Sequence, residues 1–71
     1  MTLVKCRVEL LHEELRKDPG YKPLSEFARM LLPDDELYKW TDEQGGIGCS
    51  GYMAKRMGCI ELRIITAAWV A

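Results

Sequence analysis

Two segments of this chain, one toward each end, alternate between apolar and polar residues. In TLVKCRVEL the even positions from 4 to 10 are apolar, and the odd positions between them are charged. In CIELRIITAAWV apolar residues flank Glu61 and Arg63, and β-branched and aromatic residues follow. A period of two is typical of a strand with one buried face, and the composition of the second segment favours a strand. We expect these two strands to pair with each other, because a single strand is not stable by itself.

The N-terminal segment also fits a helix, because apolar residues recur at helical spacing from Val4 through Val8 and Leu11 to Leu15. One helix over residues 2–17 is therefore an alternative to a strand followed by a helix, and it would make the protein an all-α helical bundle. The C-terminal segment favours the first interpretation. The fold class that we predict is α+β: one small domain, since 71 residues leave room for no more, with paired terminal strands and short helices between them.

The chain between the two ends is predicted to be helical. The segment LLHEELRK is rich in helix formers and stops at the turn signal DPG. A second helix over LSEFARMLL ends before Pro33, because the residue before a proline resists helical angles. A third begins with the acidic stretch of DDELYKW, which complements the helix dipole, and Leu37 and Trp40 face inward. A fourth, short helix over GYMAKR is capped by Ser50 and closed by Gly58.

The stretch GIGCSG has the spacing of a dinucleotide-binding loop, but its context does not fit one. Such a loop follows a strand and opens a helix, with an acidic residue about 20 positions further on for the ribose. The segment before it is predicted to be helical and acidic, and residues 66–71 hold no acidic side chain. A phosphate-binding P-loop is excluded too, because Tyr52 and Met53 stand where lysine and serine or threonine are required. We therefore predict a connecting loop and no cofactor.

The charge of the chain argues against nucleic acid as its main partner. Ten Lys and Arg residues against eleven Asp and Glu residues leave a net charge of −1 and no basic field to collect phosphates. A helix-turn-helix-like pair over residues 24–40 supports the alternative function, that of a small DNA-binding regulator. Its second helix, however, would begin with Asp34, Asp35 and Glu36, which repel a phosphate backbone. With Asp42 and Glu43, these residues predict an acidic face instead.

The sequence does not predict an enzyme. Zinc binding by the single histidine, His12, and the three cysteines is disfavoured, because no two cysteines stand two to four residues apart. The odd number of cysteines favours free thiols, as in a reducing compartment. No apolar run approaches the roughly 20 residues of a membrane span, and no signal-peptide pattern opens the chain. We expect a cytoplasmic protein that binds no metal, cofactor or membrane.

Protein binding is the function that we predict. The chain holds more aromatic and sulfur-containing side chains than so small a core encloses, and such side chains are enriched at contact surfaces. Each of these side chains is equally compatible with a position in the core. Trp69 lies on a predicted edge strand, where a second chain can pair. We expect a small adaptor or inhibitor of a larger protein partner of unknown identity, or a homodimer. The residues predicted to make the contact are Asp34, Asp35, Glu36, Tyr38, Trp40 and Trp69.

Overall fold

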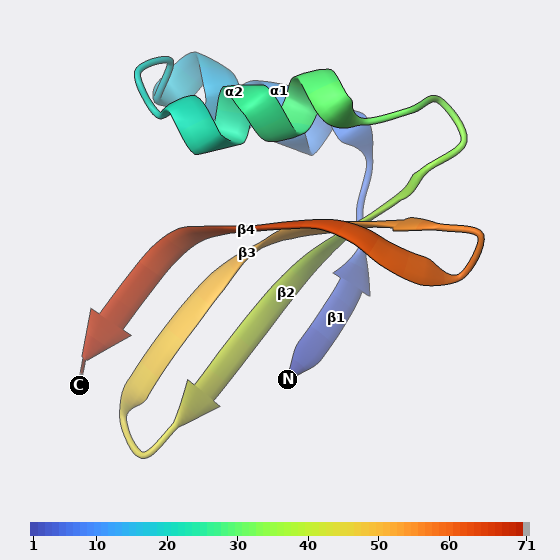
Figure 1. The fold of residues 1–71 in the computed structure, drawn as a ribbon. Helices are drawn as coiled ribbons and strands as arrows, with labels where there is room; N and C mark the ends of the chain where they lie inside the picture. The colour runs from blue at the N-terminus through green and yellow to red at the C-terminus, as the bar shows by residue number, and fades with distance from the viewer. Residues whose placement is uncertain (71) are drawn as a thin grey trace.

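The computed structural model describes residues 1–70 and consists of a four-stranded sheet with two helices over one of its faces (Figure 1). The elements in chain order are β1 (Thr2–Lys5), α1 (Val8–Lys17), α2 (Lys22–Met30), β2 (Glu36–Gln44), β3 (Ile47–Arg56) and β4 (Cys59–Val70). The strand order is β1-β2-β3-β4, and every neighbouring pair is antiparallel. The α+β class is confirmed, and the all-α bundle is wrong.

The two terminal strands do not pair, contrary to our prediction. They form opposite edges of the sheet, with β2 and β3 between them. The cause lies in two tight turns, which pair β3 with β2 and β4 with β3, so that β4 cannot reach β1. Gly45 and Gly46 join β2 to β3 at φ values of 59° and 83°, and Met57 and Gly58 join β3 to β4 at 54° and 82°. Positive φ at both central residues suits a hairpin turn, because its twist matches that of the flanking strands.

The third and fourth predicted helices are also wrong, because residues 36–44 and 47–56 are strands. Ser50 therefore lies within β3 and caps no helix, and Gly58 closes a hairpin rather than a helix. The predicted connector GIGCSG contributes Gly46 to the β2–β3 turn, whereas its other five residues are the first half of β3. The helix-turn-helix-like pair over residues 24–40 is absent, because α2 is followed by a strand.

The N-terminal region resolves into a strand followed by a helix. β1 covers four residues, and α1 starts three residues later. The turn signal DPG indeed follows α1, and α2 starts at Lys22 with Pro23 in its first turn, a position where the missing N–H of proline costs little. These two helices confirm the first two that the sequence predicts, with α2 ending at Met30 rather than closer to Pro33.

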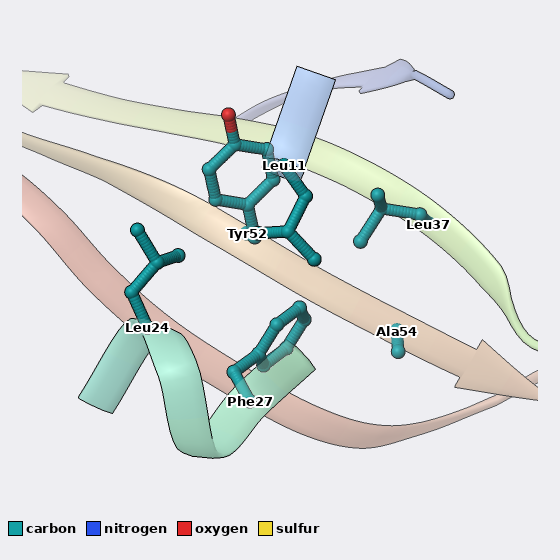
Figure 2. Packing of buried hydrophobic residues seen from close by; sticks show 6 residues of the cluster. All are labelled: Leu11, Leu24, Phe27, Leu37, Tyr52 and Ala54. Atoms are coloured by element: carbon teal, nitrogen blue, oxygen red, sulfur yellow. The ribbon is translucent and has the colours of Figure 1, made fainter. Parts of the chain in front are cut away.

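The main core lies between the helices and the sheet (Figure 2). Its buried members are Leu11 from α1, Leu24 and Phe27 from α2, Leu37 from β2, and Tyr52 and Ala54 from β3. Each large apolar side chain buried in this way contributes about 1.5–3 kcal/mol. The Tyr52 hydroxyl donates a hydrogen bond of 3.2 Å to Oε1 of Glu14 on α1. Burial, followed by the charge of Glu14, raises the pKa of Tyr52, so the neutral phenol belongs to the folded state.

A second buried cluster lies on the opposite face of the sheet, away from the helices. Trp40 and Met53 have no exposed surface, although no helix covers them. The Trp40 indole N–H donates to the carbonyl oxygens of Tyr52 at 3.3 Å and Ile64 at 3.2 Å, and the Arg63 guanidinium carbon stands 4.1 Å above the ring. The indole is thus held by hydrogen bonds to β3 and β4 and covered by the Arg63 cation. Trp40 and Met53 therefore form a second, small core on this face of the sheet.

Candidate protein-binding surface

The structure uses Asp35, a predicted contact residue, for an internal ion pair. Its Oδ1 accepts from Arg56 Nε and its Oδ2 from Arg56 Nη2, both at 2.8 Å, and the Leu32 amide donates to Oδ2 at 2.9 Å. The Asp35 side chain is 1% exposed. The hydrogen bonds from Arg56 and then from Leu32 lower the pKa of Asp35 to about 2. Asp35 therefore fastens the segment before β2 to the end of β3, whereas its neighbour Asp34 is exposed.

Glu36 and Tyr38 are the two predicted contact residues that the structure brings together. The Tyr38 hydroxyl donates to Glu36 Oε2 at 2.7 Å, and Lys5 Nζ lies 3.8 Å from the same oxygen. The hydrogen bond and then the charge of Lys5 lower the pKa of Glu36, and its bond to Glu36 raises that of Tyr38. Lys55 Nζ lies 5.0 Å from the Tyr38 ring centre. Charges therefore compensate one another in this group, and the expected acidic face does not include Glu36.

The two predicted contact tryptophans, Trp40 and Trp69, do not lie on one common surface. Trp40 is fully buried, so we remove it from the contact residues. Trp69 lies on the edge strand β4, and its indole N–H donates to Glu43 Oε2 at 3.0 Å. The ring covers Gly48 so closely that a Cβ atom there would overlap it. Trp69 is thus half-buried at the end of the sheet opposite to Tyr38.

An apolar surface that the sequence did not predict covers the sheet near the β2–β3 turn, on the face away from the helices. We call it the distal patch. Its members on β3 and β4 are Ile47, Cys49, Ile65, Ala68 and Val70. The register aligns Ile47 with Val70, Cys49 with Ala68 and Gly51 with Ile65, whereas the adjacent Tyr52 and Ile64 pack against the main core. Because successive strand residues point to opposite faces, the patch faces away from α1 and α2.

The distal patch is exposed and carries no charge. The exposed fractions are 63% for Ile47, 50% for Ile65 and 79% for Val70. Asp42 and Gln44 of β2 border it, and a shallow hollow runs between them and the patch residues on β3 and β4. Figure 1 shows this end of the sheet extending beyond the two helices. An antiparallel sheet with one solvated face usually presents polar side chains there, so a contiguous apolar group on that face is a candidate contact surface.

A groove of about 420 Å³ is a second depression in the described part of the molecule. It lies between the start of α1, the end of α2 and the start of β2, and Val8, Leu31 and Leu37 contribute apolar walls. Its two acidic residues, however, already have partners, since Asp35 binds Arg56 and Glu36 binds Lys5 and Tyr38. The distal patch, whose bordering Asp42 has no ion pair within residues 1–70, is therefore the better candidate surface.

Among residues 1–70, no three His, Cys, Asp or Glu side chains gather where they could hold a metal ion. Cys6, Cys49 and Cys59 are free cysteines. In that same part of the chain, neither helix has the length and apolar character needed to span a bilayer. Comparisons of the chain with protein-family models, curated proteins and solved structures find no match.

Proposed function

We propose that this protein is a small, cofactor-free protein-binding module that acts as an adaptor or inhibitor of a larger protein, and that it docks through the distal patch. The observation that carries the proposal is the exposure of Ile47, Ile65 and Val70 together on a sheet face that no helix covers. The three free cysteines favour the reducing cytoplasm as its location.

The composition of the surface supports this proposal. Interfaces bury an apolar centre surrounded by a polar rim, and here an uncharged centre is bordered by Asp42 and Gln44. Covering apolar surface contributes about 25 cal/mol for each Å² removed from water. An unpaired carboxylate at the rim acts mainly on the rate of association and on the choice of partner. We therefore assign binding energy to the patch and steering to Asp42.

A matched pair of variants tests this proposal. Ile47→Glu places a charge in the patch, whereas Met57→Glu places the same charge on a residue that is 99% exposed in the β3–β4 turn. Both variants and the natural chain serve as baits in a lysate of the source cells, after circular dichroism has established that they fold. The proposal expects one protein that the natural chain and Met57→Glu retain in equal amounts and Ile47→Glu loses. Equal retention by all three baits would place the contact elsewhere.

A further inference from the structure

The outer edge of β4 is the longest strand edge that the fold leaves without a neighbouring strand. The two edges of the sheet are β1, with four residues, and β4, with twelve. An edge strand presents unpaired main-chain N–H and C=O groups, and an extended segment of another chain can add to them as a further strand.

The hydrogen-bonding pattern identifies the residues of β4 whose main-chain groups point outward. The Cys6 amide donates to the Leu37 carbonyl, so Leu37 and alternate residues of β2 point toward β1. Alternation across an antiparallel sheet then directs Gly51 toward β2 and Ser50 toward β4, where Ser50 is aligned with Ala67. The groups of Ala67 therefore point inward. Those of Ala68 and Val70 point outward, away from β3.

Upstream of Ala67 the same edge is obstructed. The Ile65 carbonyl accepts a hydrogen bond of 2.6 Å from the Tyr21 hydroxyl, which also shows that this carbonyl points outward. Thr66 is an extra residue in β4, because Ser50 is aligned with Ala67 and Gly51 with Ile65. A bulge of this kind interrupts the ladder and protects an edge. The accessible edge therefore consists of residues 67–70, which adjoin the distal patch through Ala68 and Val70.

A hollow beside this edge fits a basic side chain. It measures about 280 Å³ and is lined by Asp18, Tyr21 and the β4 residues Ile65, Thr66, Ala67 and Ala68. Lysine and arginine bury their aliphatic stems against apolar surface while the charged end stays near water or a carboxylate. Asp18 is the one acidic residue that lines the hollow, and it has no ion pair within residues 1–70. The charge of Asp18 is thus complementary to a cationic side chain placed in the hollow.

We propose that the partner adds an extended segment to the β4 edge at Ala68 and Val70, and that a lysine or arginine of this segment occupies the hollow at Asp18. The inference rests on the proposed function and extends it, because the added strand would continue the distal patch sideways. Main-chain hydrogen bonds would supply affinity. The position of the basic side chain relative to the apolar ones would supply specificity.

Two synthetic peptides of about eight residues serve as probes, one alternating lysine with valine and the other alternating glutamate with valine. Both favour extended structure and differ only in charge. The proposal expects the lysine peptide to slow amide exchange at Ala68 and Val70 by about tenfold at saturation, and the glutamate peptide to bind at least about tenfold more weakly. Unchanged exchange at both amides with either peptide, or equal affinity for the two peptides, would overturn it.

Ala68→Pro tests the main-chain contact, because proline removes an outward N–H without breaking a bond to β3. The lysine peptide should no longer bind Ala68→Pro, whereas Ile47→Glu should still bind it. Asp18 is exposed and lies outside the sheet, so we expect Asp18→Asn to fold. This variant should bind the lysine peptide several-fold more weakly, and it remains informative if the proline variant does not fold. Undiminished binding by Asp18→Asn would overturn the assignment of the hollow.

Two further outcomes separate this inference from the proposed function. If the natural partner is lost from Ile47→Glu but retained by Ala68→Pro, the distal patch is the binding surface and the added strand is wrong. Analytical ultracentrifugation of the protein alone should give a monomer. A dimer that Ala68→Pro converts to a monomer would assign the edge to a second copy of this chain and would likewise overturn the inference.

Discussion

Arg56 and Asp35 form a two-pronged ion pair that fastens the segment before β2 to the end of β3. Both of its hydrogen bonds measure 2.8 Å, and the Asp35 carboxylate is almost completely covered. The planar guanidinium fits a carboxylate in this paired geometry, which an ammonium group cannot reproduce. Because the ion pair joins the α2–β2 connection to β3, we expect it to contribute to the stability of the domain rather than to partner binding.

Arg56→Lys should lower Tm by several degrees, because a lysine retains the charge but cannot form both hydrogen bonds with Asp35. Arg29→Gln on the exposed side of α2 is a control that removes a cation without breaking an ion pair found within residues 1–70. Thermal unfolding followed by circular dichroism measures both. Equal Tm values for Arg56→Lys and the natural chain would show that the paired geometry contributes nothing.

The same carboxylate predicts how stability depends on acid. The pKa of Asp35 is about 2 in the fold, against an ordinary value of 3.8. Its contribution is therefore complete above pH 3.8 and is lost as the pH falls through 2. Urea unfolding at a series of pH values should show this loss. In Asp35→Asn the domain should be less stable at neutral pH and should lose less stability over the acidic range; parallel curves would contradict this assignment.

Gly51 should tolerate no side chain. A Cβ atom at this position would overlap the Ile64 carbonyl oxygen, which is the oxygen that accepts the Trp40 indole N–H. We expect Gly51→Ala to lower the free energy of unfolding by about 1–3 kcal/mol, the usual cost of overpacking. Gly20→Ala is the matched control, since no atom lies within 4 Å of its added Cβ. Chemical denaturation compares the two, and equal losses would contradict the close approach of β3 and β4.

The two tryptophans should respond differently to replacement by phenylalanine. Trp40→Phe leaves the Tyr52 and Ile64 carbonyls without their buried donor, so we expect a loss of about 1–3 kcal/mol. Trp69→Phe removes an exposed hydrogen bond to Glu43 and the part of a half-buried ring that covers Gly48, and it should cost less than about 1 kcal/mol. Urea denaturation of both variants provides the measurement. A larger loss for Trp69→Phe would reverse our assignment of the second buried cluster.

The sequence predicted α1, α2 and β4, and it predicted β1 as a longer strand that extends into residues of α1. It did not predict the two central strands, which it assigned to helices. DDELYKW combines helix formers with Leu37 and Trp40 three residues apart, a spacing that places both on one side of a helix. In β2 the same spacing places them on opposite faces, and both are buried because the main core lies on one face and Arg63 covers the other. The pairing of the two terminal strands was predicted from their alternating pattern alone. The positive φ angles of the Gly45–Gly46 turn instead make β2 pair with β3.

The candidate surface was harder to predict, because it depends on register. Ile47 and Val70 are far apart in the sequence and become neighbours only when β3 and β4 pair. Of the three acidic residues that the sequence offered as contacts, Asp35 and Glu36 bond to other side chains of the fold, whereas Asp34 is exposed. A usable signal was the end of β4, AAWV, where polar residues no longer alternate with apolar ones. A strand without such alternation indicates that its second face is also covered or in contact.

Methyl-resolved NMR, recorded while the captured partner is added to labelled protein, tests the central claim most directly. If the distal patch is the binding surface, the methyl signals of Ile47, Ile65 and Val70 shift or broaden together. Those of Val8 and Leu32 beside the groove between the helices and β2, both exposed in the free protein, stay in place. The opposite result, with changes at Val8 and Leu32 and none on the patch, would contradict the account and move the binding surface to that groove.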